Sequence, residues 1–345
     1  MGIATLMRET GMVVMPRLEW SSPRMEKLDR LAWVAGTAFL SYGVRVGIRA
    51  NDHGVLEQVR DYMPLIWTPS SSSVVDVLHS LVLGNPGRGA GKGSNLLYSG
   101  AERRAYSQSL GYVLKCLKNS VEIDIALRAP DRLFVHAGVV GWQGKAILIP
   151  GRSFAGKTEL VAALVRAGAA YYSDENAVLD ASGCVHPYPV RLGLRARNGR
   201  PGKRFAIEEL GGHSGTQPLE VALVAVLKYR PGARWRPRAL SPGEATLALL
   251  ANTVCARTRP RFALDILRRV AERAVACRGD RCEAEDMVAP LLEQLESLAT
   301  VSDRVRGPGP SRETSLEGTV APAVSRLHVG GGEYDSCGAQ GEIVR

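Results

Sequence analysis

One segment of the sequence has the residue types and the spacing that bind phosphate groups. Residues 151–158 read Gly-Arg-Ser-Phe-Ala-Gly-Lys-Thr and match the pattern G-x-x-x-x-G-K-[ST] without a mismatch. Glycines let backbone N–H groups turn towards phosphate oxygens, the lysine reaches the β- and γ-phosphates, and the hydroxyl holds Mg²⁺. A glycine-containing turn that fits the pattern by coincidence is the alternative. The segment predicts a nucleotide-binding loop made of Gly151, Arg152, Ser153, Phe154, Ala155, Gly156, Lys157 and Thr158.

The elements that must position this loop are readable on both sides of it. Residues 146–150 form an apolar run typical of a buried strand, and residues 159–166 predict a helix whose N-terminus faces the phosphates. Upstream, the apolar runs 133–142 and 145–149 are joined by Gln143-Gly144, which predicts a tight β-hairpin.

The predicted hairpin brings His136 to the phosphate loop. If Gln143-Gly144 forms the turn, Trp142 pairs with Lys145, and counting back pairs His136 with Gly151. His136 then lies at the mouth of the loop. A histidine satisfied inside an apolar core is the alternative, and both interpretations stay open at this point.

Two neighbouring carboxylates, Asp174 and Glu175, follow a predicted strand over residues 169–172. Phosphate-loop proteins place an acidic residue at the end of a neighbouring strand to hold Mg²⁺ directly or through water. With two carboxylates, one could hold the metal while the other takes a proton from an attacking hydroxyl. A solvated turn is the alternative. Residues 177–179 and 184–185 predict a second hairpin directly afterwards, which argues against a helix there.

Hydrophobic periodicity predicts further elements on both sides of this centre. Before it, we expect a strand over 44–48, a short helix over 55–63, a strand or helix over 74–83, an amphipathic helix over 102–119 with Tyr106 on its apolar face, and a strand over 121–125. After it, we expect a buried strand over 219–229, a helix over 241–253 opened by a capping box, and helices over 261–276 and 284–298.

These elements predict an α/β protein with four parts. Residues 1–30 show no sustained period and are predicted to be irregular, and residues 31–128 form a small α+β accessory domain. The phosphate-loop domain spans 129–300, and the Gly-, Pro- and Ser-rich residues 301–345 are predicted to be disordered.

Composition limits the partners and the compartment. The net charge is +10, from 44 Lys and Arg against 34 Asp and Glu, which suits acidic partners such as nucleotides, phosphoproteins or nucleic acid without choosing among them. The six cysteines are scattered without a C-x-x-C pair, so we expect reduced thiols and a cytoplasmic protein. The most apolar run, residues 31–44, is shorter than the roughly 20 residues that a membrane span needs. We expect no membrane partner.

Two basic segments could contact phosphates or an acidic substrate. The first runs over 191–204, where a solvated charge run is the alternative, and the second surrounds Trp235 over 230–238, where an exposed linker is the alternative. No aromatic residue except Phe205 interleaves the first segment, so a nucleic-acid stacking surface is not favoured there. The basic residues of the first segment are Arg191, Arg195, Arg197, Arg200, Lys203 and Arg204.

Three segments, in their order and spacing, resemble the catalytic domain of HPr kinase/phosphorylase. They are Val-His-Ala-Gly-Val-Val at 135–140, the loop with its following glutamate at 151–159, and Tyr-Ser-Asp-Glu at 172–175. The resemblance covers about residues 133–176. It implies a fold similar to the phosphoenolpyruvate carboxykinases rather than to Ras-like NTPases, and transfer of phosphate from ATP with Mg²⁺ to a serine hydroxyl.

The resemblance also implies a role for each matched residue. Lys157 contacts phosphates, His136 lies near them, and Asp174 is the general base that takes the hydroxyl proton. Thr158, Glu159 and Glu175 form the metal side of the site. Glu175 stands where the family has Asp, and residues 188–204 contain no acid. The resemblance therefore implies neither HPr as the acceptor nor phosphorylase activity, and a different serine-containing protein or peptide is expected.

The sequence thus predicts an ATP- and Mg²⁺-dependent serine kinase with a protein or peptide substrate, and it is compatible with a homo-oligomer. The alternatives are a regulatory protein that binds ATP without turnover and a kinase of a small metabolite. The intact set of Lys157, Thr158 and Asp174 favours the enzyme.

Overall fold

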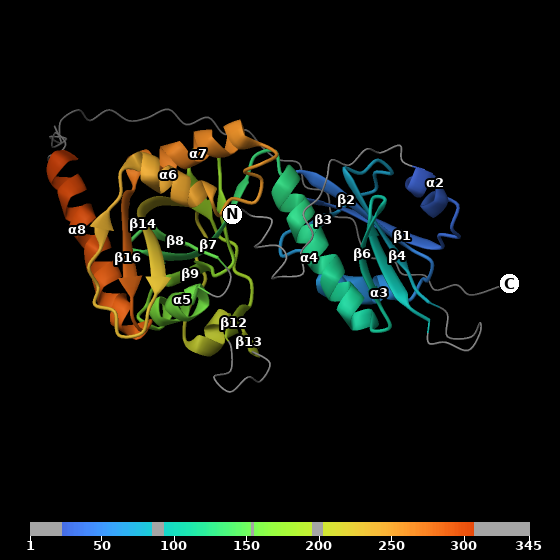
Figure 1. Ribbon diagram of the computed structural model, residues 1–345, viewed down its shortest axis with the longest axis horizontal. Coiled ribbons are helices and arrows are strands. Elements are labelled where there is room, and N and C mark those ends of the chain that lie inside the picture. The colour runs from blue at the N-terminus through green and yellow to red at the C-terminus, as the bar shows by residue number, and fades with distance from the viewer. Residues whose placement is uncertain (1–22, 85–92, 153–154, 195–202, 307–345) are drawn as a thin grey trace, which may run out of the picture. The chain divides into compact units, whose positions relative to one another are not determined.

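The computed structural model describes residues 23–84, 93–152, 155–194 and 203–306. It contains a six-stranded sheet, an eight-stranded sheet and a two-stranded hairpin, with helices packed on both larger sheets (Figure 1). This is the mixed α/β class that the sequence predicts. Five cysteines, at positions 116, 184, 255, 277 and 282, are described as free thiols.

The six-stranded sheet follows helix α2 (Pro23–Asp29) and is built from the first third of the chain. Its strand order is β3-β1-β2-β4-β5-β6, and β2 and β4 are the parallel pair. Tyr42 and Gly43 have φ values of 48° and 77°, so the β1–β2 connection is a two-residue turn that matches the twist of its strands. The elements are β1 (Ala35–Ser41), β2 (Val44–Ala50), α3 (Val55–Val59), the 3₁₀ helix η1 (Arg60–Tyr62), β3 (Thr68–Pro69), β4 (Val77–Val82), β5 (Asn95–Ser99), β6 (Glu102–Ser107) and α4 (Leu110–Arg128).

Three predictions for this part are wrong. Residues 102–107 form strand β6, not the start of a helix, and Tyr106 is 63% exposed instead of buried. Helix α4 begins after Ser109, whose hydroxyl accepts a hydrogen bond from the Tyr112 N–H, and it continues to Arg128. The predicted strand over 121–125 therefore belongs to this helix. Val121 and Ile125 are four residues apart, a spacing that suits one helical face as well as one strand face.

The third error concerns the N-terminus, where Pro23–Asp29 forms helix α2 within the region predicted to be irregular. Other predictions for this sheet are confirmed. Strand β2 buries Val44, Val46 and Ile48, and the Asp52 carboxylate accepts a hydrogen bond from the Val55 N–H at the start of α3. The strand-or-helix alternative over 74–83 resolves to strand β4.

The eight-stranded sheet carries the phosphate-loop segment. Its order is β11-β10-β7-β8-β14-β16-β15, with β9 paired to β7 and a further pairing between β11 and β14. Strands β8, β14 and β16 are parallel, so their carboxyl ends lie at one edge. The strands are β7 (Leu133–Trp142), β8 (Lys145–Pro150), β9 (Ala170–Ser173), β10 (Asn176–Leu179), β11 (Cys184–His186), β14 (Leu219–Tyr229), β15 (Arg238–Ala239) and β16 (Val275–Arg281), and β12 (Leu192–Leu194) pairs separately with β13 (Lys203–Phe205).

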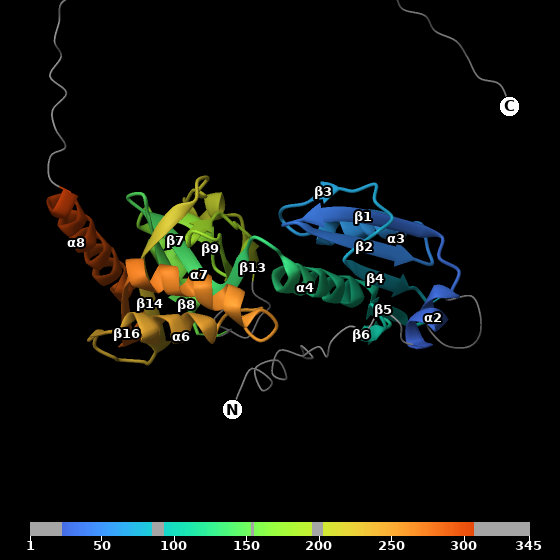
Figure 2. The same cartoon turned by 90° about the horizontal axis from the view of Figure 1, so that it is seen from above.

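Alternating side chains of strand β8 supply two cores, one on each face of this sheet. Ile147 and Ile149 pack into a cluster with residues of α5 (Lys157–Arg166) and α8 (Val288–Arg306). Ala146 and Leu148 pack into a cluster with residues of α6 (Pro242–Leu250) and α7 (Pro260–Arg273). Figure 2 looks onto the α7 side. Burial on both faces explains why β8 and β14 read as continuous apolar runs. The 3₁₀ helices η2 (Ile207–Leu210) and η3 (Glu285–Met287) complete the described elements.

The C-terminal half confirms its predicted strand over 219–229 and its three helices in outline, and it adds strands that were not predicted. The capping box at α6 is present, with Ser241 and Glu244 exchanging hydrogen bonds, although the helix ends at Leu250 and not near Thr253. Helix α7 ends at Arg273, and the strand β16 that follows was not predicted. Helix α8 extends to Arg306, six residues into the predicted disordered tail, and the rest of that tail lies outside the described residues. No helix in the described part of the chain is long and apolar enough to cross a bilayer.

Candidate phosphate-binding site

The hairpin that carries the site has the predicted register. Trp142 pairs with Lys145 across the turn, and the ladder continues to Ala137 opposite Pro150. Both turn residues have positive φ, 48° at Gln143 and 75° at Gly144, as a tight two-residue hairpin requires. One step further, the Gly151 N–H donates to the His136 carbonyl at 3.3 Å. The backbone of His136 therefore lies beside the first residue of the loop.

Helix α5 begins directly after the loop, at Lys157, and points its N-terminus back towards it. Gly156 at the helix cap has a φ of 72°, a left-handed conformation that glycine adopts without strain. The first N–H groups of a helix have no acceptor within the helix, and with the helix dipole they attract an anion. Ser153 and Phe154, predicted as loop residues, lie outside the described residues.

The Lys157 side chain is buried and bonded to the loop. Its Nζ donates to the carbonyl oxygens of Gly151 at 2.8 Å and Arg152 at 2.9 Å, and it lies 3.1 Å from Nε2 of His136. An ammonium can only donate, so His136 Nε2 accepts and the ring proton of the neutral histidine is on Nδ1. The structure thus brings the predicted lysine and the predicted histidine together.

Burial controls the ionisation of this pair. It lowers the pKa of Lys157 to about 8, although the nearby carboxylates of Asp174, Glu175 and Glu159 favour the charged ammonium. Burial also lowers the pKa of His136 to about 4, and the Lys157 charge lowers it further, while a hydrogen bond to the Glu175 backbone acts in the opposite direction. At neutral pH the site holds a neutral imidazole beside a cationic lysine.

Asp174 and Glu175 lie in a break between two strands that pair with the same neighbour. Strand β9 pairs with residues 139–141 of β7, and β10 pairs with residues 133–136. The Ser173 hydroxyl accepts the N–H groups of Glu175 and Asn176 and so shapes the break. The Ala137 N–H donates to the Glu175 carbonyl at 3.2 Å, which fixes the break opposite the loop end of β7.

The Asp174 carboxylate connects this break to the loop helix. Its Oδ2 accepts a hydrogen bond from the Thr158 hydroxyl at 2.8 Å, and its Oδ1 lies 2.8 Å from the hydroxyl of Tyr171. Burial raises the pKa of Tyr171 and the Asp174 charge raises it further, so the phenol keeps its proton. Tyr171 was not predicted as a site residue, because its place in a buried strand is typical of a core residue.

Arg281 was also missed by sequence reasoning, and it fixes the loop from the other side. Its Nη2 donates to the carbonyl oxygens of Gly156 at 2.8 Å and Ala155 at 3.2 Å. The side chain is only 3% exposed. A Cβ on Gly156 would lie 2.2 Å from this guanidinium, which gives the glycine a second reason to be there. Burial lowers the pKa of Arg281, and the charge of Glu159 opposes that shift.

The metal-side prediction named Thr158, Glu159 and Glu175. Among the described residues, no group of three or more His, Cys, Asp or Glu side chains is arranged to hold a metal ion. A Mg²⁺ that arrives with a nucleotide takes few protein ligands, because phosphate oxygens and water fill most of its positions. The Thr158 hydroxyl, which donates to the Asp174 carboxylate at 2.8 Å, is an oxygen of the kind that phosphate loops offer to such an ion.

No family model matches the chain, and no curated protein matches it. The function is therefore argued from the geometry of this site.

Proposed function

We propose that the chain is an ATP- and Mg²⁺-dependent kinase that transfers the γ-phosphate to a hydroxyl, serine in a protein or peptide. The observation that carries the proposal is the hydrogen bond between the loop hydroxyl of Thr158 and the strand-end carboxylate of Asp174. It joins two halves of a phosphoryl-transfer site that are separate in the sequence. The resemblance of residues 133–176 to HPr kinase/phosphorylase supports the same activity.

The binding half consists of the loop, the N-terminus of α5 and Lys157. Backbone N–H groups and the ammonium are fixed in place before the phosphates arrive, which lowers the cost of arranging them. Lys157 donates to two loop carbonyls and His136 in the described geometry, and on nucleotide binding it redirects a donor to a phosphate oxygen. Neutral His136 accepts from the lysine without repelling it.

The transfer half consists of Asp174 and Glu175. As the serine oxygen bonds to the γ-phosphorus, the bond from that phosphorus to the β–γ bridging oxygen breaks, ADP leaves, and the hydroxyl proton passes to a carboxylate. We assign that proton to Asp174, as the resemblance implies, with Glu175 beside it. Mg²⁺ bound with the nucleotide would supply charge neutralisation, and Thr158 and Glu175 are the residues that would hold it.

A regulatory protein that binds ATP without turnover would use only the binding half. The observation against that alternative is the pair of carboxylates held in the strand break, because binding of nucleotide alone does not need a second acid next to the first. A small-molecule acceptor would use the same two halves, so the acceptor itself has to be found by experiment.

The test is transfer of label from γ-³²P-ATP with Mg²⁺ to a library of serine-containing peptides. The full chain is compared with Asp174→Asn and with Asp265→Asn, an exposed carboxylate on α7, as the matched control. We expect labelled serine with the full chain and the control, and a loss on the order of 10²-fold with Asp174→Asn.

Two outcomes contradict the proposal in different ways. Full transfer by the Asp174→Asn variant would remove the base assignment and leave the kinase. If calorimetry shows that ATP binds and no serine, threonine or small-molecule hydroxyl is labelled, the regulatory protein becomes the better description.

A further inference from the structure

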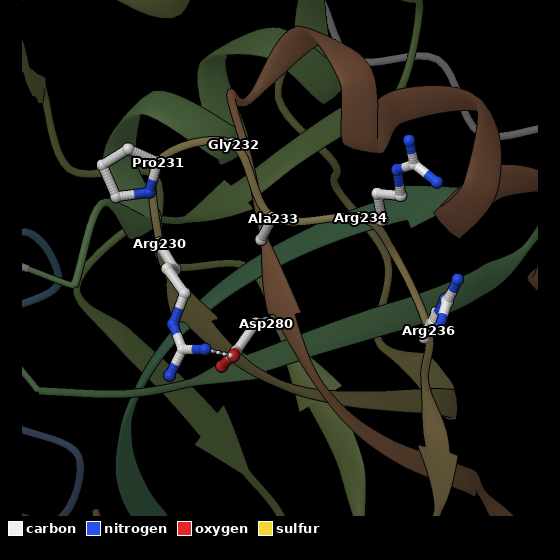
Figure 3. A pocket seen from close by; sticks show the side chains of 7 residues that line it. All are labelled: Arg230, Pro231, Gly232, Ala233, Arg234, Arg236 and Asp280. Atoms are coloured by element: carbon white, nitrogen blue, oxygen red, sulfur yellow. Dashed lines mark ion pairs between the residues drawn. The ribbon is translucent and has the colours of Figure 1, made fainter.

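A second basic feature lies at the same sheet edge as the phosphate loop. The turn after β14 surrounds a pocket of about 440 Å³ (Figure 3). We propose that this pocket binds an acidic segment of the acceptor polypeptide, an inference that rests on the proposed kinase function. The pocket is lined by Arg230, Pro231, Gly232, Ala233, Arg234, Arg236 and Asp280.

The charges of the pocket are out of balance. Arg230 pairs with Asp280 at 3.2 Å, which accounts for the single carboxylate in the lining. Arg234 and Arg236 point away from Asp280 in Figure 3, and no residue in the described part of the chain pairs with either of them. Guanidinium groups bind carboxylates through paired hydrogen bonds, so two of them in one pocket favour an acidic ligand.

The turn that carries these arginines is fixed to the sheet. The Arg230 N–H donates to the Arg281 carbonyl at 2.9 Å, and the Ala233 N–H donates back to the Arg230 carbonyl at 3.1 Å. Trp235 covers Gly279 so closely that a Cβ there would lie 2.6 Å from the indole ring. A fixed turn loses little conformational entropy on binding, which favours a recognition surface over a loose linker.

The location ties the pocket to the phosphate loop. Strands β14 and β16 are parallel and end beside each other, and ligands of parallel sheets bind outside such carboxyl ends. Successive residues of a strand point to opposite faces. Accordingly, Asp280 bonds to Arg230 in the pocket, whereas Arg281 bonds to the loop carbonyl of Gly156. The pocket and the loop therefore lie at the same edge of the sheet and are joined through adjacent residues of β16, on its two faces.

The arrangement favours a polypeptide over a small anion. Arg234 and Arg236 do not converge on one point, whereas an extended acidic segment presents a carboxylate every second residue on the same side. The nucleotide phosphates have their own donors in the loop and in α5. An acidic segment held here would bring a neighbouring serine of the same polypeptide to the sheet edge that carries the phosphate loop.

The experiment measures binding of a fluorescein-labelled octaglutamate peptide by fluorescence anisotropy, without nucleotide. The full chain is compared with the double variant Arg234→Gln and Arg236→Gln. The matched control is Arg257→Gln with Arg261→Gln, which removes the same charge from two exposed arginines outside the pocket. We expect at least a tenfold weaker Kd for the pocket variant and a change within twofold for the control.

Two results would overturn the inference. Equal weakening in both double variants would mean that the peptide senses only net charge. Displacement of the peptide by ATP, at concentrations that saturate the loop, would place a nucleotide in the pocket. ATP affinity is measured separately on each variant and is expected to stay within twofold. If the pocket variant binds the peptide normally, the kinase proposal is unaffected. If no phosphate transfer is found, the peptide-binding result still decides whether the pocket binds acidic segments.

Discussion

Two histidines of this chain, His79 in a closed core and the partly buried His136 at the phosphate loop, have pKa values lowered to the same level by different surroundings. Burial lowers the pKa of both His136 and His79 to about 4. His136 lies on β7 next to Lys157, where a helix N-terminus faces the phosphate loop. His79 lies on β4 of the six-stranded sheet, fully enclosed, with Nε2 at 3.5 Å from the Asp124 carboxylate. That distance is too long for a good hydrogen bond.

The surroundings of His79 form a closed cluster. Asp124 accepts a hydrogen bond from Ser99 at 3.0 Å and pairs with Arg128, and its side chain is only 1% exposed. No described residue hydrogen-bonds either ring nitrogen of His79. A perturbed pKa therefore does not mark a functional site by itself. What distinguishes His136 is a neighbouring helix N-terminus whose N–H groups require an acceptor.

The largest expected effect is a loss of phosphate transfer when the lysine beside His136 is replaced, which replacing a lysine on α4 should not cause. Lys157→Met removes the cation that donates to the loop, so we expect phosphate transfer to fall on the order of 10³-fold, as when a fixed transition-state donor is lost. Folding stability should hold or rise, because a buried charge is removed. The measurement is initial-rate transfer of label together with urea unfolding.

The control for that variant is Lys118→Met on α4, which removes a lysine paired with Glu122 outside the site. Its transfer rate should stay within twofold of the unchanged chain. Equal loss in both variants would mean that the assay follows net charge and not the loop.

The next effect concerns the cluster around His79, where a substitution should lower folding stability and leave ATP binding unchanged. Asp124→Ala leaves Arg128 and Ser99 without their shared buried acceptor, and we expect a loss of about 3 kcal/mol in the free energy of unfolding. Urea unfolding at 25 °C measures this loss. Calorimetry should show unchanged ATP affinity below the unfolding transition. A variant that keeps its stability and loses ATP would place the cluster in the functional site.

A smaller effect distinguishes the two carboxylates inside the site. We expect Asp174→Asn to lower transfer on the order of 10²-fold and Glu175→Gln to lower it less, because the Asp174 carboxylate is the one held by the Thr158 hydroxyl at the loop helix. The rates are measured at several Mg²⁺ concentrations. A loss that persists at every concentration supports the base role. Recovery of Asp174→Asn at high Mg²⁺ would mean that this carboxylate holds the metal instead.

The parts of the site that the sequence could predict are those formed by residues close together in the chain. The loop, its helix, the hairpin register and the carboxylate pair all lie within residues 133–176, and each follows from turn chemistry or from periodicity over a few residues. Arg281 reaches the loop from more than 100 residues further along the chain. Its strand has only three apolar residues before a charged stretch and is held by parallel pairing with β14. Local patterns carry no information about that pairing.

The six-stranded sheet shows the corresponding limit for the fold. Residues 102–107 place Tyr106 at a helical spacing from Leu110, yet pairing with β5 makes them a strand and leaves Tyr106 exposed. Val121 and Ile125 satisfy helical and strand spacing alike, and the Ser109 cap decides for the helix. Short stretches support both periods, so tertiary pairing and caps decide between them.

The smallest expected effect is a pH dependence that Lys157 should show. Its pKa is lowered to about 8 before nucleotide binds, and bound phosphates should raise it by favouring the ammonium. Binding then takes up protons above pH 8, so ATP affinity is full below that pH and falls as the pH rises through it. Linkage gives a loss of about tenfold between pH 7 and pH 9. Calorimetry in buffers of different ionisation enthalpy measures both the affinity and the proton uptake.

The matched variant for this prediction is Lys157→Arg, because a guanidinium stays charged over the whole pH range. Its ATP affinity should be lower than that of the unchanged chain at pH 7 but flat up to pH 9. The histidines cannot produce this change, since the pKa of each lies near 4. If both proteins lose affinity equally above pH 8, the titrating group is not Lys157, and the neutral histidine beside it loses its assigned role of accepting from a cation.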